Sequence, residues 1–548
     1  MPADPMAVSL LKRWSTLEQQ RTTWEDLWQD VADYCVPRKA DISRKRSPGD
    51  QRTQRLFDGT AVHSAELLSA SLHGMLTNAA SNWFSLRYRD ELLHDDDTAK
   101  EWLEEAERIL YAALARSNFQ EQIHELYHDL VTFGTGVMIV EEENDGMRFS
   151  TRHISECYLS EDENGRVDTV YRKFQMPARA VAEKFGNKNV SQRVLKLLET
   201  HPYDLVTLMH VVRPREEIDI TREDSANKPF MSCYLDPEAK MVYAVSGYNE
   251  FPYVCPRYLK ASFELGYGRS PATSAIADIK MLNKMSEVTI RAAQKQVDHP
   301  LMVPDDGFML PIRTVPGGLN FYRSGTRDRL EPLNIGANNP LGLNMEEQRR
   351  GAIRSAFYVD QLVMGTGPTM TATEVIQRTE EKMRLLGPVM GRLQAELLQP
   401  LIDRCFNILL RNKQFPDFPE VIQNNNIDVE YVSPLAKAQR NGDIQSLVRL
   451  FELITPIAQV DPGVMDYLDT DGMAKHLIRT VGIPASAVRG TEEVEQMRRE
   501  KAQQEQAAQE MMQAQQSAEA AGQAAPMVKA LGGQEGIAQL LGGEGEAA

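Results

Sequence analysis

Two long helical patterns on either side of a segment rich in Pro and Gly most constrain the fold of this 548-residue chain. Ser270-Pro271 is typical of a helix start, with Ser as the N-cap and Pro at the first helical position. No Gly or Pro follows before Val297, so the pattern predicts a helix of roughly 40 Å at about 1.5 Å per residue. Pro and Gly then recur through residues 299–343, and a second helical pattern covers Met345–Leu362.

A third helical pattern follows a loop that contains two glycines. Thr371 and Glu374 have the spacing of a capping box, and the pattern that they open continues to about Leu410. Helices of this length without a compact partner pattern predict the walls of an assembly rather than the pocket of an enzyme.

Composition sets independent limits on the class of protein. A chain of 548 residues predicts two to four packing units. Its net charge of -17 makes it a poor candidate for wrapping nucleic acid, because such binding depends on neutralising phosphates, but the charge suits the wall of a conduit for DNA. The five cysteines have no metal-ligand spacing and predict buried, reduced thiols. No apolar run is long enough to cross a membrane, and no export signal is indicated.

The first half of the chain predicts helices followed by a β-rich body. Helical patterns cover Met6–Val36 and about residues 60–78, 98–115 and 119–132. Short β-rich runs then extend from Gly136 to Leu259, which predicts an α+β fold that is predominantly helical overall.

The motif His124-Glu125-Leu126-Tyr127-His128 matches the H-E-x-x-H pattern of zinc hydrolases. The positions at which an extended motif would supply Gly and His hold Val131 and Gly134 instead. The helix already has an apolar face, so the sequence favours surface or interface histidines and predicts neither a catalytic residue nor a metal or cofactor.

Three further motifs each have a functional and a structural interpretation. The basic stretch from Arg38 to Arg55 fits phosphate binding as well as it fits a solvated loop or contact with an acidic neighbour. Residues 94–97, His-Asp-Asp-Asp, favour capping of the next helix over a cation site. Residues 134–136, Gly-Thr-Gly, lack the Lys of a phosphate loop and predict a turn.

The first long helix has apolar residues that do not form one narrow stripe, including Ile279, Leu282, Met285 and Val288. A helix packed between two neighbours needs contacts on two sides, so this distribution favours a ring. The alternative is an ordinary buried helix. Charges of both signs, such as Asp278, Lys280, Glu287 and Arg291, could pair between subunits.

The order of these parts resembles the portal, or head-to-tail connector, proteins of short-tailed bacteriophages. The stretches that carry the resemblance are 164–172 (NGRVDTVYR), 267–271 (YGRSP), 371–378 (TATEVIQR) and 431–436 (YVSPLA), and the likeness extends from about Trp14 to Arg489.

The resemblance implies a portal fold with wing, stem, clip and crown regions, assembled as a ring. Its regions would be 1–269 (wing), 270–298 (first stem helix), 299–343 (clip), 344–362 (second stem helix), 363–370 (tunnel loop), 371–412 (long kinked wing helix), 413–490 (crown) and 491–548 (C-terminal helix and flexible tail).

The resemblance also gives candidate site residues. The tunnel loop in the DNA channel would contain Met364, Gly365, Thr366, Gly367, Pro368 and Thr369. Basic candidates in the clip are Arg313, Arg323, Arg327 and Arg329. The long helix would bend at Gly387, Pro388 and Pro400, where Pro removes a backbone donor.

We therefore interpret the chain as a structural subunit, not an enzyme. The resemblance implies a homo-oligomer, a dodecamer in the family, at one capsid vertex of the virion, formed in the host cytoplasm. Its partners would be double-stranded DNA, terminase, a tail adaptor, and capsid and scaffolding proteins, with no membrane. The alternatives are a zinc-dependent hydrolase that uses residues 124–128, and a helical scaffold or adaptor.

Overall fold

The computed structural model describes residues 4–44, 46–47, 49–88, 96–143, 146–218, 222, 224–225, 227–264, 266–298, 300–302, 311–312, 319–321, 331–332, 340–362, 386–419, 427–430, 449–450, 452–456, 471–474, 477 and 491–530. The chain separates into two compact units. The first contains Met1–Arg89 and Glu105–Pro456, and the second contains Asp90–Glu104 and Ile457–Ala548.

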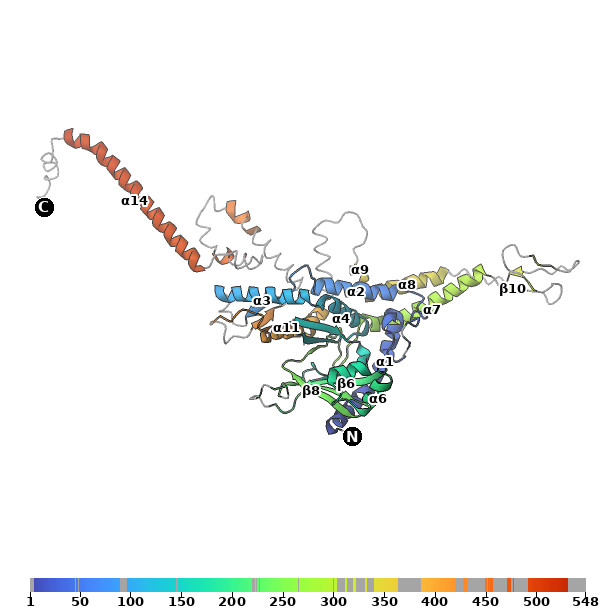
Figure 1. Ribbon diagram of the computed structural model, residues 1–548. Coiled ribbons are helices and arrows are strands. Elements are labelled where there is room, and N and C mark those ends of the chain that lie inside the picture. Colours follow the sequence, from blue (N-terminus) through green and yellow to red (C-terminus); the bar gives the residue numbers. More distant parts are fainter. Residues whose placement is uncertain are drawn as a thin grey trace. The chain divides into compact units, whose positions relative to one another are not determined.

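The first unit opens with helices, as the sequence predicts (Figure 1). They are α1 (Pro5–Cys35), α2 (Thr60–Leu76), α3 (Asp97–Arg116, which enters this unit at Glu105) and α4 (Phe119–Phe133). A short 3-10 turn, Pro37–Lys39, follows α1. Trp28, Val31 and Leu17 of α1 are buried, which confirms the apolar side expected of this helix.

A five-stranded antiparallel sheet forms the β-rich body. Its strands are β4 (Cys157–Glu161), β5 (Val167–Pro177), β6 (Leu205–Pro214), β7 (Phe230–Asp236) and β8 (Met241–Tyr248), paired in chain order. A smaller sheet has the order β3-β2-β9, formed by β3 (Gly146–Thr151), β2 (Met138–Glu143) and β9 (Tyr253–Val254). Successive side chains of a strand point to opposite faces of the sheet, so apolar residues on both faces give the larger sheet two cores, one on each face.

One core of that sheet lies against α1, where Leu10 and Leu17 pack on Tyr171 and Met209. The other lies against two short helices, α5 (Ala178–Phe185) and α6 (Gln192–Thr200). No helical pattern in the sequence marks α5 or α6, because helices this short, between strands, repeat their apolar spacing too few times to be distinguished.

The remaining elements follow the sheets in the chain. They are α7 (Pro271–Val297), β10 (Leu301–Met302), β11 (Glu331–Pro332), α8 (Pro340–Ala356), α9 (Val359–Leu362), the π-helical turn Gln394–Leu398, α11 (Gln399–Arg411) and β12 (Ile427–Glu430), which pairs with β1 (Ser85–Tyr88). Residues 386–393 are α-helical and lead into the π turn. The second long pattern was predicted to run unbroken to Leu362. That prediction was wrong at Tyr358, whose φ of 58° separates α8 from α9.

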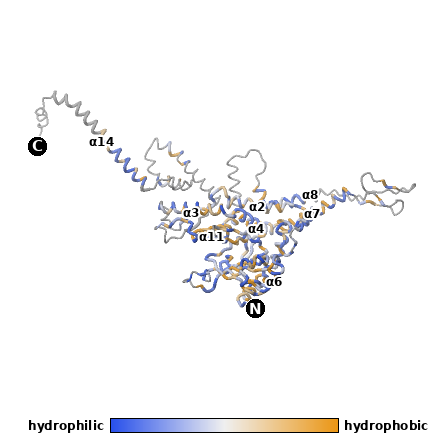
Figure 2. Tube along the Cα trace, in the orientation of Figure 1, coloured by the Kyte–Doolittle hydropathy of each residue, from blue (hydrophilic) through white to orange (hydrophobic). Residues whose placement is uncertain are grey.

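The second unit contains α14 (Thr491–Ala530), which begins at the first residue of the segment 491–548 expected to hold a C-terminal helix. The coloured part of this helix is mostly hydrophilic along its length (Figure 2). Within the same unit, Asp96 Oδ1 accepts a hydrogen bond of 2.8 Å from the N–H of Ala99. The prediction that residues 94–97 cap α3 is therefore confirmed at Asp96, and His94 and Asp95 lie outside the described residues.

Two glycines bring the backbones at the end of α4 and the start of α7 together. Gly134 ends α4 in the left-handed region with φ of 81°, and a Cβ placed there would lie 2.3 Å from the carbonyl oxygen of Gly268. The chain bends at Gly134, and Thr135 then pairs with Arg257 in an isolated antiparallel bridge, where the sequence predicted a turn. The N–H of Gly268 also donates to Thr135 Oγ1 at 2.8 Å, so the bend sits directly against the segment that begins α7.

We predict that Gly134→Ala lowers the free energy of unfolding by about 3 kcal/mol or more, because it adds a steric clash to an unfavourable φ. Gly49→Ala is the matched control. Gly49 also has a positive φ, 89°, in a turn closed by the hydrogen bond from the N–H of Asp50 to the carbonyl oxygen of Ser47, but a Cβ added there would meet nothing within 4 Å, so the cost is about 1 kcal/mol. Urea unfolding of both variants measures the difference, and equal losses would contradict the steric explanation.

Candidate assembly site

The start of α7 is fixed by side chains that satisfy its free backbone groups. Ser270 Oγ accepts from the N–H of Thr273 at 3.0 Å, and Thr273 Oγ1 accepts from the N–H of Ser270 at 2.8 Å. Ser270 Oγ also donates to the carbonyl oxygen of Thr132 at 2.6 Å. The predicted N-cap and the predicted length of the helix are confirmed, and the cap ties α7 to the end of α4.

One face of α7 is buried against its own chain. Ala275, Ile279, Leu282 and Ser286 lie on this face. Helix α8 runs beside α7 (Figure 1), where Arg349 pairs with Asp278 at 2.6 Å. Thr289 Oγ1 donates to the buried Glu346 at 2.6 Å. The two helices therefore form a pair held by packing and by polar contacts.

A second apolar stripe on α7 is only partly covered in the single chain. It consists of Met281, Met285, Val288 and Ala292, spaced as one helix face, of which Met285 and Ala292 are half-buried. At about 100° per residue, this stripe is centred about 120° from the buried face. Met281 is 47% exposed and Val288 is 56% exposed. The stripe is the kind of surface that a second polypeptide covers.

The charges on α7 have partners within the single chain. Lys280 pairs with Asp30, and both Lys284 and Arg291 pair with Glu287. Asp278 pairs with Arg349 of α8. Pairing of these charges between subunits stays a prediction.

The segment that leads to α7 carries a buried arginine, Arg257, which is 2% exposed. Its Nε and Nη2 donate to the two carboxylate oxygens of Glu396, at 2.9 and 2.8 Å, in a bidentate pair. Its Nη1 pairs with Glu161 at the end of β4, and its Nη2 also donates to the carbonyl oxygen of Gly165 at 2.9 Å. Arg257 thus joins the five-stranded sheet, the segment before α7, and the π turn Gln394–Leu398.

Several predicted site residues cannot be placed. Met364, Gly365, Thr366, Gly367, Pro368 and Thr369 of the predicted tunnel loop lie outside the described residues, as do Arg313, Arg323, Arg327 and Arg329 of the predicted clip. Gly387 and Pro388 lie in the α-helical residues 386–393, and Pro400 lies in the first turn of α11, directly after the π turn.

The H-E-x-x-H motif has an arrangement unsuited to a hydrolase. Burial alone would raise the pKa of Glu125, but hydrogen bonds from Lys39 and Arg38 lower that pKa to about 2. A general base requires a pKa near neutrality, so Glu125 is a poor candidate for that role. His124 lies beside His73 of α2, with ring centroids 5.6 Å apart, and His128 is buried. Within the described ranges, no three His, Cys, Asp or Glu side chains are grouped as a metal site requires.

The basic stretch after α1 contacts acidic groups of the same chain. Arg44, Arg46 and Arg55 lie 3.2 to 3.3 Å from the carboxylate of the buried Asp33, and Arg52 pairs with Asp41. Of the two interpretations left open by the sequence, contact with acidic groups is therefore the one that the described residues support. Sequence reasoning could not choose, because Asp33 lies on the buried side of α1 with nothing in the pattern to mark it.

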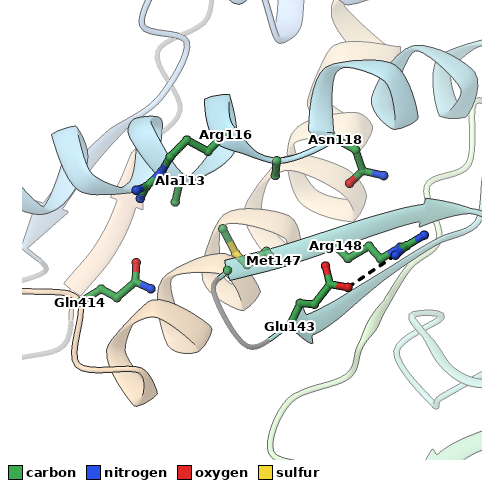
Figure 3. A pocket seen from close by; sticks show the side chains of 9 residues that line it. Ala113, Arg116, Asn118, Glu143, Met147, Arg148 and Gln414 are labelled. Atoms are coloured by element: carbon green, nitrogen blue, oxygen red, sulfur yellow. Dashed lines mark hydrogen bonds and ion pairs between the residues drawn. The ribbon is translucent and has the colours of Figure 1, made fainter.

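A cavity of about 650 Å³ lies between the end of α3, the β2–β3 hairpin and the residue Gln414 (Figure 3). Arg148 and Glu143 form an exposed ion pair at its rim, 3.5 Å apart. The side chains of Arg116 and Gln414 line the same cavity, but no residue pair with the geometry of a nucleophile and its base lies among the residues that line it.

All five cysteines are buried and free, as predicted. None of the described helices has the length and hydropathy needed to cross a bilayer.

Comparisons with known proteins agree on one family. Residues 7–488 match the family described as Bacteriophage head to tail connecting protein. The "Probable portal protein" of Bordetella phage BPP-1 is 31% identical over 508 residues, which cover 90% of this chain and 91% of that protein. The "Portal protein" of Salmonella phage epsilon15 is 31% identical over 510 residues, with coverage of 90% and 91%.

A solved structure, "Neck of empty GTA particle computed with C6 symmetry", covers 70% of this chain and 84% of its own chain at 11% identity. Its TM-score of 0.34 is too low to support an argument about the fold.

The buried histidines predict how stability depends on pH. Burial lowers the pKa of His128 to about 4 and that of His210 to about 3. The unfolded chain therefore binds these protons first, and stability is lost as pH falls below the unfolded value of about 6.5.

Between pH 7 and pH 5 we expect a loss of about 2 kcal/mol for each of these histidines. Urea unfolding at the two pH values measures it. His128→Gln is expected to remove its share of the slope, whereas His201→Gln, at an exposed position, is expected to leave the slope unchanged. A slope that His128→Gln does not alter would contradict this assignment.

Proposed function

The chain belongs to the bacteriophage head-to-tail connecting proteins, the family of the phage portal proteins, and from this premise we propose that its copies close into a ring around a channel for DNA. The partly exposed apolar stripe of α7 is the observation that carries this proposal. A helix with one face buried in its own chain and a second apolar stripe in solvent is suited to lie between two neighbours. Repetition of one such head-to-tail contact closes into a ring when its rotation is a simple fraction of a turn.

The proposed ring contains the wing, stem, clip and crown regions that the resemblance to portal proteins implies, with α7 and α8 as the stem and the five-stranded sheet in the wing. Residues 299–343 form the clip, 363–370 the tunnel loop and 413–490 the crown, and twelve copies complete the ring. The bidentate contact of Arg257 and the paired glycines Gly134 and Gly268 support a stem that is firmly attached to the wing.

The ring would sit at one capsid vertex of the virion, after assembly in the host cytoplasm with capsid and scaffolding proteins. Double-stranded DNA would pass through the channel, with terminase docked during packaging and a tail adaptor afterwards. The net charge of -17 per copy supports passage without adhesion, because like charges repel the phosphates. The basic stretch after α1 is already paired with Asp33 and Asp41, which leaves it little capacity to hold DNA.

Electron microscopy of the purified full-length chain tests the proposal directly. We expect closed rings with a central opening. A chain that stays monomeric at high concentration, with the stripe of α7 folded onto its own surface, would overturn it.

We predict that Val288→Glu prevents ring closure, because it places a charge in the apolar contact, where an unpaired carboxylate is costly to bury. The concentration needed for assembly is expected to rise about 100-fold or more, which corresponds to about 2.7 kcal/mol per contact. Mass photometry over a range of concentrations measures this shift.

Gln294→Glu is the matched control. It adds the same charge at an exposed position of the same helix that belongs to neither stripe. Normal rings with both variants would place the contact elsewhere, and loss of rings with both would indicate a general effect of charge.

A further inference from the structure

The helix between residues 386 and 411 contains one wide turn. Residues Gln394–Leu398 are π-helical, and the N–H of Gln399 donates to the carbonyl oxygen of Gln394, five residues earlier. In a regular α-helix the partner lies four residues earlier. The turn therefore holds one residue more than the helix on either side of it, a feature often found at functional positions.

The apolar residues of this helix explain the additional residue. One buried series, Leu386, Val389, Leu393 and Leu397, ends inside the turn, and a second, Leu398, Leu401, Cys405 and Ile408, begins there. Each set follows helical spacing, but the second set begins one residue late. In an unbroken α-helix the two stripes would point about 100° apart. The π turn brings both onto one face, so the sequence itself encodes it.

Pro400 adds a second reason for the turn to lie at this position. Proline has no N–H, and in a regular α-helix its ring collides with the carbonyl four residues earlier, which belongs to Glu396. A wider turn relieves that collision. Two independent features of the sequence thus weaken the helix between residues 394 and 400.

Arg257 contacts the helix at the π turn, through Glu396. Besides the bidentate contact of its guanidinium with Glu396, its backbone N–H donates to Glu396 Oε2 at 3.0 Å. Arg392, one turn earlier in the helix, donates to Glu396 Oε1 at 3.2 Å. Arg257 also contacts Glu161 and the carbonyl oxygen of Gly165, so it connects the π turn to the five-stranded sheet.

We propose that residues 394–400 form a locked hinge, in which the π turn supplies the bend and the contacts of Arg257 with Glu396 hold its angle. Release of that lock allows residues 386–393 to swing relative to α11 while α11 stays packed. α11 has a separate anchor, since Arg404 and Arg411 both pair with Glu250. The inference depends only on contacts within one chain and stands whether or not the ring proposal holds.

Hydrogen–deuterium exchange of the full-length chain tests the lock. In Glu396→Gln we expect the exchange of the amides of residues 395–402 to increase at least tenfold more than that of residues 404–411 and of strands β5–β7 in the same variant. Glu250→Gln is the matched control, because it removes a carboxylate that pairs with the same helix outside the hinge. Unchanged exchange in Glu396→Gln, or an equal increase in Glu250→Gln, would overturn the proposal.

A second variant tests the π turn in a chain that already lacks the ion pair. Deletion of the exposed Ala395 together with Pro400→Ala, made in the Glu396→Gln background, gives a helix whose two apolar stripes are in register without a wide turn. We expect its residues 395–402 to exchange at least tenfold more slowly than those of Glu396→Gln. Exchange as fast as in Glu396→Gln would show that the turn is not the source of the hinge.

Discussion

The buried guanidinium of Arg257 is the contact on which the rest of the first unit depends. A charge 2% exposed is tolerable only when its donors are matched, and Arg257 finds carboxylates on two different elements and a carbonyl on a turn. Loss of one partner from such a buried set costs about 3 to 5 kcal/mol, because the remaining charges stay buried without compensation. Lys260, which pairs with Glu161 at 2.7 Å, extends the same set. The position of the stem helix relative to the sheet follows from this set together with the contact between Gly134 and Gly268.

Local signals in the sequence were sufficient for much of the fold. Ser270-Pro271 located the start of α7 to the residue, and the short β-rich runs from Gly136 to Leu259 located the region of the two sheets, because caps and strand composition are properties of neighbouring residues. The π turn also had a signal, since Leu397 and Leu398 end one apolar series and begin the next, but it was not recognised. Pro400 was recognised as a point of weakness, and the structure shows an altered turn directly before it.

Contacts between residues that lie far apart along the chain could not be predicted from the sequence. Nothing in the pattern around Arg257 predicts that Glu396, 139 residues later, will lie against it. The same is true of Asp33, whose burial under three arginines decides between two interpretations of the basic stretch. The family resemblance supplied the functional interpretation because it rests on the order of parts along the whole chain. It could not say which face of α7 its own chain leaves open.

The open stripe of α7 has a thermal consequence. An interface built from Met281, Met285, Val288 and Ala292 depends on the release of water from apolar surface, and this driving force weakens on cooling. Subunits joined through this stripe would then associate more readily in a warm cell than on ice, and material kept cold would contain more single copies.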